Sequence, residues 1–317
     1  MVTTPENAQK IAKFPSISSL EIVETPSPSF HATEVPGKGI GLVANKTIKR
    51  GERIMAWQPT FLMHHSLVKE LDSESQHRIL DLALHKLPAP RRRAFARQLG
   101  QFGGHQVSDI MATNSFQIDV GGDDGHHLGN FPDVSRFNHD CRPNVAFRID
   151  NHLTHHTHAV RDIAAGEELT ISYMNPFETW ASRRLHIEKS WGFVCTCKHC
   201  SMSQKEIEKS DRRLDEIEEI EAELGDFNSK KVSTRMIDRL INLYEEERLQ
   251  AKTHGAYVLA ALNYNLFGNA KKAKQYATLA VETGIIEFGP DAGDVKAMRT
   301  LAKNPKQHWS WRMRVGR

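Results

Sequence analysis

Four cysteines stand out because of where they lie in the chain. Cys141 stands alone, whereas Cys195, Cys197 and Cys200 form a C-x-C-x-x-C cluster, and these are all the cysteines among 317 residues. Closely spaced cysteines seldom reach disulfide geometry, and a chain of this size does not depend on disulfides. Four thiolates around one tetrahedral zinc ion would use every cysteine. The spacing therefore favours a structural zinc site, and the alternative is a reduced cluster with one separate buried thiol.

The segments around these cysteines contain residue types that serve in binding and catalysis. RFNHDCRPN (residues 136–144) holds Cys141, GEELTISY (residues 166–173) ends in Tyr173, and WGFVCTCKHC (residues 191–200) holds the other three cysteines. Two further motifs lie upstream, GKGIGL (residues 37–42) and TNSF (residues 113–116). The glycines of GKGIGL permit a close approach of backbone to a ligand. It is not a dinucleotide-binding fingerprint, because strands and not a helix are expected after it.

Taken in this order, the five motifs resemble those of SET-domain protein lysine methyltransferases. They are most similar to the SET and MYND branch and its fungal relatives, in which an NHxCxPN cysteine joins a following CxCxxC to hold a structural zinc. The resemblance covers roughly residues 33–203, but a MYND zinc finger is absent, since no cysteine lies between GKGIGL and TNSF. The resemblance implies methyl transfer from S-adenosylmethionine to the side-chain amine of a lysine in a histone or another protein.

The resemblance also implies roles for individual residues. Tyr173 matches the family's catalytic tyrosine, which lies beside the methyl donor and the lysine nitrogen. Phe147, Tyr173 and Phe193 are expected to border the lysine channel, and the four cysteines are expected to hold zinc. The residues expected to bind S-adenosylmethionine come from four of the motifs and the catalytic position: Lys38, Gly39, Ile40, Asn114, Asn138, His139, Tyr173, Trp191 and Phe193.

Lysine methylation requires a neutral amine, although the reference pKa of lysine is about 10.4. Burial in an aromatic channel and the nearby sulfonium charge both disfavour the ammonium form, so the proton can pass to water without a dedicated general base. Under this interpretation zinc has a mechanical role. It joins the segment of Cys141 to residues 191–200, a lid that carries Trp191 and Phe193.

Charge and composition narrow the function classes. The chain has 42 basic and 39 acidic residues and a formal net charge of +3, which predicts no large nucleic-acid-binding surface. Its mean hydropathy is −0.50, and no apolar run approaches the roughly 20 residues that span a bilayer. The N-terminal residues lack the apolar core of a secretory signal. We expect a nuclear or cytoplasmic monomer that acts on a protein substrate, without membrane attachment or direct nucleic-acid binding.

The elements that must position these residues predict an α+β fold. Residues 1–30 are rich in Ser, Thr and Pro and are expected to form a flexible N-terminal arm. Residues 31–182 contain several short strands and are expected to form a β-rich SET domain with a helical insertion at about residues 66–112. Ser73 and Gln76 have the spacing of a capping box within that insertion. Residues 183–204 are expected to form a zinc-bound post-SET segment.

The composition changes beyond Cys200, and residues 205–317 are expected to form a helical C-terminal domain. The stretch from Gln204 to Gly225 is dense in charge and in strong helix formers, which predicts a solvated helix or helical linker. Apolar side chains then recur at helical spacing from Met236. Residues 256–284 resemble a tetratricopeptide-type helix pair with its turn at Gly268-Asn269. One pair is visible, so a long repeat array is not predicted.

Two stretches contain metal-ligand residue types outside the motifs. Residues 123–127 (DDGHH) lie in a turn-rich segment without calcium-loop spacing, and we interpret them as an ordinary loop. His152, His156 and His158 alternate and are expected to share one face of a strand. An exposed strand face is favoured there over a metal site.

Two other functional hypotheses remain beside the enzyme. A non-catalytic SET-like scaffold with a structural zinc could bind proteins through its helical tail, and binding of S-adenosylmethionine would distinguish the two. The joint presence of Tyr173, Asn138, His139 and the lid aromatics favours the enzyme. Zinc-dependent nucleic-acid binding is disfavoured by the near-neutral charge and by the lack of a finger helix after the cysteines.

Overall fold

The computed structural model describes residues 1–14, 28–121 and 124–315. The chain forms two compact units. Unit 1 comprises Met1–Lys46, Arg53–Asn138 and Ile149–Thr157, and unit 2 comprises Thr47–Glu52, His139–Arg148 and His158–Arg317. Part of the predicted SET segment, residues 139–148 and 158–182, therefore groups with the helical C-terminal residues.

The first motif of unit 1 forms a hairpin. Strands β1 (Phe30–Val35) and β2 (Gly39–Ala44) pair antiparallel, with Val35 opposite Gly39. Gly37 and Gly39 have φ angles of 75° and 72°, a region that side chains with a Cβ rarely adopt. The glycines of GKGIGL are thus required by the turn, because it reverses the chain within three residues.

A second sheet of unit 1 supports the middle of the chain. Strand β6 (His126–Asn130) lies between β4 (Phe61–His64) and β5 (Ser115–Asp119), and both pairings are antiparallel. Strand β3 (Arg53–Trp57) precedes β4, and the short 3-10 helix η1 (Val134–Arg136) follows β6. The sheet places the end of β4 beside the start of β6.

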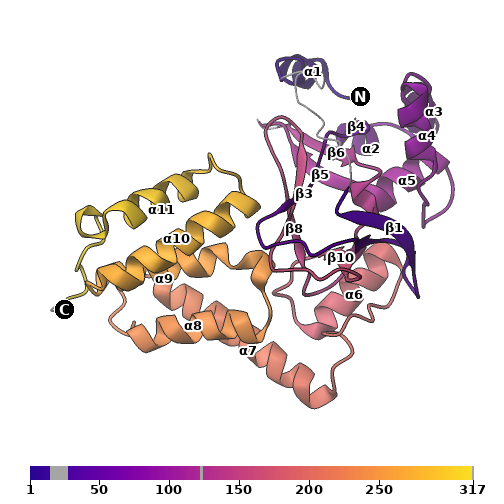
Figure 1. Ribbon diagram of the computed structural model, residues 1–317. Coiled ribbons are helices and arrows are strands. Elements are labelled where there is room, and N and C mark those ends of the chain that lie inside the picture. The colour runs from indigo at the N-terminus through magenta and orange to yellow at the C-terminus, as the bar shows by residue number, and fades with distance from the viewer. Residues whose placement is uncertain (15–27, 122–123, 316–317) are drawn as a thin grey trace. The chain divides into compact units, whose positions relative to one another are not determined.

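Helices α2 (Ser66–Glu70), α3 (Ser73–His85), α4 (Ala89–Ala96) and α5 (Gln106–Asn114) occupy the region of the predicted insertion and gather near this sheet in Figure 1. They share one apolar core with β4, built from Phe61, Leu80, Phe95, Ile110 and Met111 among others. The predicted capping box is wrong by one position. Asp72 is the N-cap of α3, and its carboxylate accepts the backbone N–H of Ser75 at 2.9 Å.

The N-terminal residues are more ordered than their composition predicts. Residues Pro5–Ile11 form helix α1, which begins after the capping side chain of Thr4. The backbone N–H of Val2 donates to the carbonyl of Leu62 at 2.8 Å. The expected flexible arm is therefore wrong for residues 2–11, and its residues 15–27 lie outside the described part.

Strand β9 (His155–Ala159) contains only part of the predicted histidine face. His156 and His158 are half-buried on it, whereas His152 lies in the turn before the strand. The carboxylate of Asp150 lies 2.8 Å from Nε2 of His156. The intervening His155 is fully buried. The prediction that three histidines share one exposed strand face is thus wrong, because His152 lies in the turn before the strand.

The segment that carries the third motif is joined to strand β10 (Glu168–Ile171). The backbone N–H of Asp140, just after β7 (Asn138–His139), donates to the carbonyl of Ile171 at 3.0 Å. Strand β8 (Val145–Ile149) follows β7 directly. Helix α6 (Trp180–Trp191) then ends at Gly192, a left-handed C-cap with φ 62°. The C-x-C-x-x-C segment begins after this cap.

Five helices form the rest of unit 2 (Figure 1): α7 (Gln204–Gly225), α8 (Thr234–Glu246), α9 (His254–Leu266), α10 (Ala270–Glu287) and α11 (Gly293–Lys303). The 3-10 helices η2 (Gln250–Lys252) and η3 (Pro305–Gln307) connect and follow them. Helices α9 and α10 present small residues to this core, among them Ala256, Ala260, Ala273 and Ala277. The predicted turn at Gly268 is present, with φ 76°.

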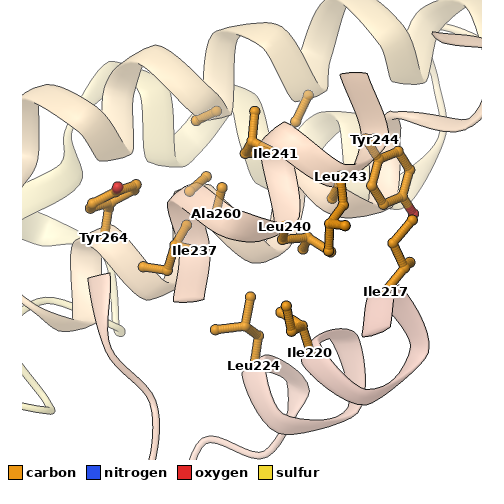
Figure 2. Close-up of a cluster of buried hydrophobic side chains, with 14 of the residues drawn as sticks. Ile217, Ile220, Leu224, Ile237, Leu240, Ile241, Leu243, Tyr244, Ala260 and Tyr264 are labelled. Carbon is orange, nitrogen blue, oxygen red and sulfur yellow. The ribbon is translucent and has the colours of Figure 1, made fainter. Parts of the chain in front are cut away.

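Figure 2 shows the core of these helices, where α8 contributes Ile237, Leu240 and Tyr244. The helix predicted for residues 204–225 is present as α7, but it is more than the solvated helix or helical linker predicted from its charge. It buries a stripe of apolar side chains at helical spacing in the same core: Leu214, Ile217, Ile220 and Leu224. Among the helices of the described residues, none is both long and apolar enough to cross a bilayer.

Candidate functional site

The structure brings the four cysteines together within unit 2. Their sulfur atoms all lie within 4.8 Å of one another, and all four residues are buried. Sγ of Cys141 is 3.4 Å from Sγ of Cys200. A tetrahedral zinc ion with Zn–S bonds of about 2.3 Å separates its sulfurs by about 3.8 Å. The cluster therefore has the ligand type, the number and nearly the spacing of a structural zinc site.

Hydrogen bonding among the thiols prepares the cluster for a cation. Contacts with Cys141, Cys195 and Cys200 lower the pKa of the Cys197 thiol. The backbone N–H of Cys200 also donates to Sγ of Cys197 at 3.4 Å. Hydrogen bonds with Cys195, Cys197 and Cys200 raise the pKa of Cys141 in turn, so the thiols share their protons unevenly, and zinc, which binds the thiolate form, would displace them.

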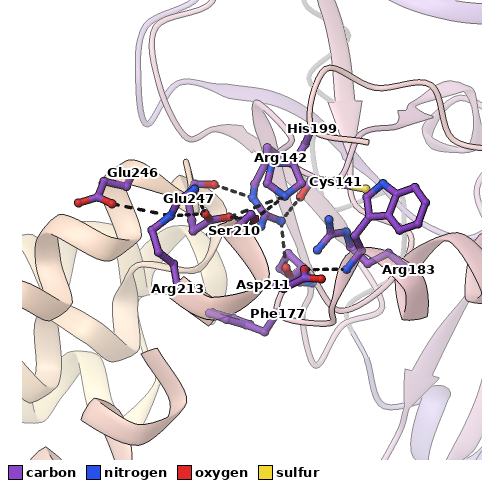
Figure 3. Close-up of polar contacts among 12 residues, drawn as sticks. Cys141, Arg142, Phe177, Arg183, His199, Ser210, Asp211, Arg213, Glu246 and Glu247 are labelled. Atoms are coloured by element: carbon purple, nitrogen blue, oxygen red, sulfur yellow. Dashed lines mark hydrogen bonds and ion pairs between the residues drawn. The ribbon is translucent and has the colours of Figure 1, made fainter. Parts of the chain in front are cut away.

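A buried arginine follows the first cysteine and is part of a polar network within unit 2 (Figure 3). Nη1 of Arg142 donates to the carbonyl of Cys141 at 2.9 Å, and Nη2 donates to Oε2 of Glu247 at 2.8 Å. The same carboxylate accepts from Ser210 Oγ at 2.8 Å and from Arg213 Nε at 2.7 Å. This network connects the segment of Cys141 to α7 and to the end of α8.

Helix α6 contributes a second buried guanidinium to this region. Arg183 is 1% exposed, and its Nε and Nη2 have no hydrogen-bond partner among the described residues. Burial, together with the charges of Arg142 and Arg183, lowers the pKa of His199 to about 3. Zinc with four thiolates carries a net charge of −2, which would offset the two guanidinium charges. The residues present therefore fit a zinc–thiolate group.

His139 links the cysteine cluster to the predicted catalytic tyrosine. Nδ1 of His139 accepts the backbone N–H of Tyr173 at 3.1 Å, so the proton of a neutral imidazole lies on Nε2. Nε2 is 3.4 Å from Sγ of Cys141 and donates to it. A metal-ligand sulfur and the backbone of Tyr173 are thus held by one buried side chain.

Aromatic rings surround Tyr173. Its ring centroid lies 5.3 Å from that of His139 and 5.3 Å from that of Trp191. The ring of Phe193 lies 6.4 Å from that of His139, and Phe193 is 38% exposed. Burial, and to a lesser degree the charge of Glu168, raises the pKa of the Tyr173 hydroxyl. Tyr173 therefore stays protonated at neutral pH and offers a neutral hydroxyl.

The other predicted cofactor residues lie in unit 1. Lys38, Gly39 and Ile40 form the turn between β1 and β2 and the first residues of β2. Asn114 ends α5, and its side-chain amide donates to two backbone carbonyls of its own unit at 2.8 and 3.1 Å. Asn138 begins β7. Their shared role in cofactor binding stays a prediction, as does a place for Phe147 of β8 in the lysine channel.

Sequence reasoning missed the residues that hold the third and fourth motifs together. Nδ2 of Asn144 donates to Oε1 of Glu167 at 3.0 Å, and Oδ1 of Asn144 accepts the backbone N–H of Thr170 at 2.9 Å. A buried asparagine within a motif was the available signal. No local signal existed for the pair of Arg142 and Glu247, because 105 residues separate them.

Comparisons with known proteins agree with this geometry. The family model described as SET domain matches residues 39–174. The chain is similar to "Histone-lysine N-methyltransferase set5" of Schizosaccharomyces pombe, with 27% identity over 286 residues that cover 88% of this chain and 85% of the relative. "Histone-lysine N-methyltransferase SET5" of Eremothecium gossypii is 37% identical over 79 residues, 24% of this chain and 16% of the relative. "N-lysine methyltransferase SMYD2" of Gallus gallus is 35% identical over 124 residues, 38% of this chain and 26% of the relative.

The fold and the site thus define a SET-domain protein. The chain contains a SET domain, and it is similar to the fungal SET5 histone-lysine methyltransferases and to SMYD2. The resemblance predicted from the motifs is confirmed. The alignment spans most of the fission yeast relative, but about a quarter or less of the other two.

Proposed function

We propose that this chain transfers a methyl group from S-adenosylmethionine to the side-chain amine of a lysine in a histone or another protein. The observation that carries the proposal is the placement of Tyr173, whose backbone is bound by His139 and whose ring lies against Trp191. The names of the relatives, histone-lysine and N-lysine methyltransferases, support the substrate class.

Aromatic side chains of unit 2 suit the charged cofactor. When bound, S-adenosylmethionine supplies an electrophilic methyl group on a sulfonium. Tyr173, Trp191 and Phe193 offer ring faces that attract such a cation. The imidazole of His139 is occupied by its two protein partners, so its main chain would contact the cofactor. Asn114, Asn138 and residues 38–40 are proposed to complete the binding site.

Tyr173 is proposed to orient the lysine amine. Its raised pKa keeps the hydroxyl protonated, so Tyr173 does not serve as a phenolate base. A neutral hydroxyl accepts one hydrogen bond and donates another, which directs the amine lone pair towards the methyl carbon. The lysine proton passes to water before transfer, and Phe147 and Phe193 exclude water from the channel walls.

The cysteine cluster is proposed to hold a structural zinc ion and not a catalytic one. Four protein ligands leave no open position for a substrate. Its effect on the reaction runs through His139, which is hydrogen-bonded to both Cys141 and Tyr173. Zinc would therefore fix the distance between the cofactor segment and the residues that follow α6.

The helical part is proposed to select protein substrates. The pair α9 and α10, with small residues packed at the crossing, supports a single tetratricopeptide-like unit. We further propose that the protein acts as a monomer in the nucleus or the cytoplasm and does not bind nucleic acid directly.

The proposed activity can be tested with labelled S-adenosylmethionine and fractionated cell protein. Tyr173→Phe should reduce methyl transfer by about 10²–10³-fold and change the cofactor Kd, measured by calorimetry, much less. Tyr276→Phe in α10 is the matched control and should transfer methyl groups like the wild type. Equal transfer by Tyr173→Phe and wild type would refute the role of Tyr173. Absence of both transfer and cofactor binding in the wild type would instead support a scaffold.

A further inference from the structure

Two adjacent histidines and an aspartate that is distant from them in sequence meet at one end of the sheet of β4, β6 and β5. His64 ends β4, His65 follows it, and Asp124 precedes β6. One nitrogen of each histidine and one carboxylate oxygen lie within 4.8 Å of one another. His64 is buried, His65 is half-buried and Asp124 is exposed, so the group is anchored in the protein and open to solvent on one side.

The distances agree with those of metal ligands. Nε2 of His64 lies 3.3 Å from Oδ1 of Asp124, and Nε2 of His65 lies 3.6 Å from the same oxygen. A tetrahedral zinc ion with Zn–N and Zn–O bonds of about 2.0–2.2 Å separates its ligand atoms by about 3.3–3.6 Å. A zinc ion can therefore contact the three atoms with small adjustments of the side chains.

The hydrogen bonds around His65 leave its other nitrogen directed at the carboxylate. Nδ1 of His65 lies 3.0 Å from the backbone carbonyl of His126. A carbonyl only accepts, so the proton lies on Nδ1 and a neutral ring has its lone pair on Nε2. That lone pair faces Oδ1 of Asp124, another acceptor, and a cation must lie between them or the ring must be protonated. Metal-bound histidines characteristically donate their second N–H to a carbonyl in this way.

His64 has a partner for the same arrangement. Its Nδ1 accepts the backbone N–H of Ser66 at 3.2 Å and also lies 2.7 Å from Oγ of Ser66, a hydroxyl that can accept the proton when Nε2 binds a metal. Without metal, Nε2 donates instead to the backbone carbonyl of Asp124 at 3.0 Å. Metal binding at Nε2 would therefore give up the bonds to the carbonyl of Asp124 and from the backbone N–H of Ser66, and keep the one from Nδ1 to Oγ of Ser66.

A neighbouring cleft leaves room for a fourth ligand. It has a volume of about 410 Å³ and is lined by His65, Asp119, His126 and the strand residues beside them. The fourth position is left to solvent, which reaches the group at the exposed side chain of Asp124.

We propose that His64, His65 and Asp124 form a second metal site, separate from the cysteine cluster, for zinc or another late first-row divalent ion. Two imidazoles disfavour magnesium and calcium, which prefer oxygen ligands. From local pattern alone, residues 123–127 are predicted to be an ordinary loop, because the histidine partners of Asp124 lie about 60 residues away. Binding would attach Asp124, two residues before β6, to the end of β4.

The test uses the untagged full chain and counts metal per chain. The wild type should bind two equivalents of Zn²⁺, and His65→Ala or Asp124→Asn should retain one and bind the other at least tenfold more weakly. His85→Ala, which removes a partly exposed histidine of α3, should retain both. Mg²⁺ should not compete. A wild type that binds one equivalent, or variants that retain both, would overturn the proposal in favour of a proton-bridged ion pair.

Cobalt distinguishes the two sites on the wild type alone, which covers the case of a variant that fails to fold. The Cys site should give thiolate-to-cobalt charge-transfer absorption, whereas the histidine site should add only weak ligand-field bands with the second equivalent. Zn²⁺ should also raise the melting temperature of His85→Ala and wild type more than that of His65→Ala. A cobalt titration that ends after one equivalent, with no further ligand-field absorption, would count against the second site.

Discussion

Nη2 of Arg142 lies 2.8 Å from Oε2 of Glu247, and the two side chains are 1% and 0% exposed. Arg142 follows the cysteine that comes from the third motif, and Glu247 is the C-cap of α8. Burial alone would raise the pKa of Glu247, but hydrogen bonds from Arg142, Ser210 and Arg213 lower it below its usual value. The carboxylate is therefore ionised and ties the cysteine segment to the helical part of unit 2 (Figure 3).

Glu247→Gln should destabilise the protein by about 3–5 kcal/mol, because it leaves a buried guanidinium without its counter-charge. The free energy of unfolding is measured with denaturant. The adjacent Glu246→Gln is the matched control: Glu246 is 45% exposed in its ion pair with Arg239, so its loss should cost less than about 1 kcal/mol. Equal losses in the two variants would show that burial of the pair does not matter.

Cys197→Ser should release the metal of the cysteine cluster and weaken S-adenosylmethionine binding at least tenfold, because His139 would lose its fixed sulfur partner. Lys198→Ser, an exposed change in the same segment, should bind both zinc and cofactor normally. Metal content and calorimetry measure the two effects. Chelation of the wild type should also abolish cofactor binding. Full methyl transfer by a protein shown to be free of metal would contradict the mechanical role of zinc.

Local patterns explain how much of this architecture the sequence predicts. The four cysteines, Tyr173 and Trp191 lie in short motifs. The spacing of such motifs can be recognised in a single sequence. Helix α1 was missed because Ser, Thr and Pro dominated the composition, although Thr4 before Pro5 is a helix-start signal: Thr4 Oγ1 accepts the N–H of Asn7 at 3.3 Å. In α7, the many charged residues outnumber the apolar side chains, so the buried apolar stripe was not predicted.

Contacts between distant segments could not be predicted in the same way. Glu247 is an ordinary charged residue in a helix of charged residues, and only the fold shows that it meets Arg142. His64 and Asp124 are likewise brought together by strand pairing, since β4 lies beside β6. A single sequence shows the secondary-structure propensity of its residues and the period of its apolar side chains, but not which strands pair. Sites that depend on strand pairing are therefore found only from the tertiary structure.

Stability should fall as the pH is lowered from 7 to 5. His155 packs between Phe116 and Phe131, with ring centroids 4.7 and 5.1 Å away. The pKa of His155 is lowered from 6.5 to about 3, mainly by burial of its side chain. Between these values the unfolded chain binds a proton that the folded chain does not, so folding loses up to about 1.4 kcal/mol per pH unit.

His155→Phe should reduce this pH dependence. The loss at pH 5 from His155 alone is about 2 kcal/mol, and denaturant unfolding at pH 7, 6 and 5 measures it. The phenyl ring does not titrate, so the variant should show a shallower slope whatever its stability at pH 7. His85→Ala, which changes a partly exposed histidine, should keep the wild-type slope. An unchanged slope in His155→Phe would exclude His155 as the source.

Adding a single methyl group at Gly284 of helix α10 should destabilise the protein. A Cβ there would lie 2.7 Å from Cε1 and Nδ1 of His254 and 2.8 Å from Cγ2 of Val295. His254 cannot easily yield, because it is buried and its Nδ1 bonds the carbonyl of Ala280 at 2.9 Å. Gly284→Ala should therefore cost about 1–3 kcal/mol, although alanine is the better helix former.

The control for this substitution is Gly255→Ala in α9, where an added Cβ would meet no heavy atom within 4 Å. Without a clash, the helix propensity of alanine should stabilise that variant by up to about 1 kcal/mol. Opposite signs for the two alanines, measured by denaturant unfolding, would show that close packing of α10 against α9 and α11 outweighs backbone entropy. Two stabilising substitutions would mean that His254 moves aside, and the packing at this crossing would then be looser than the structure shows.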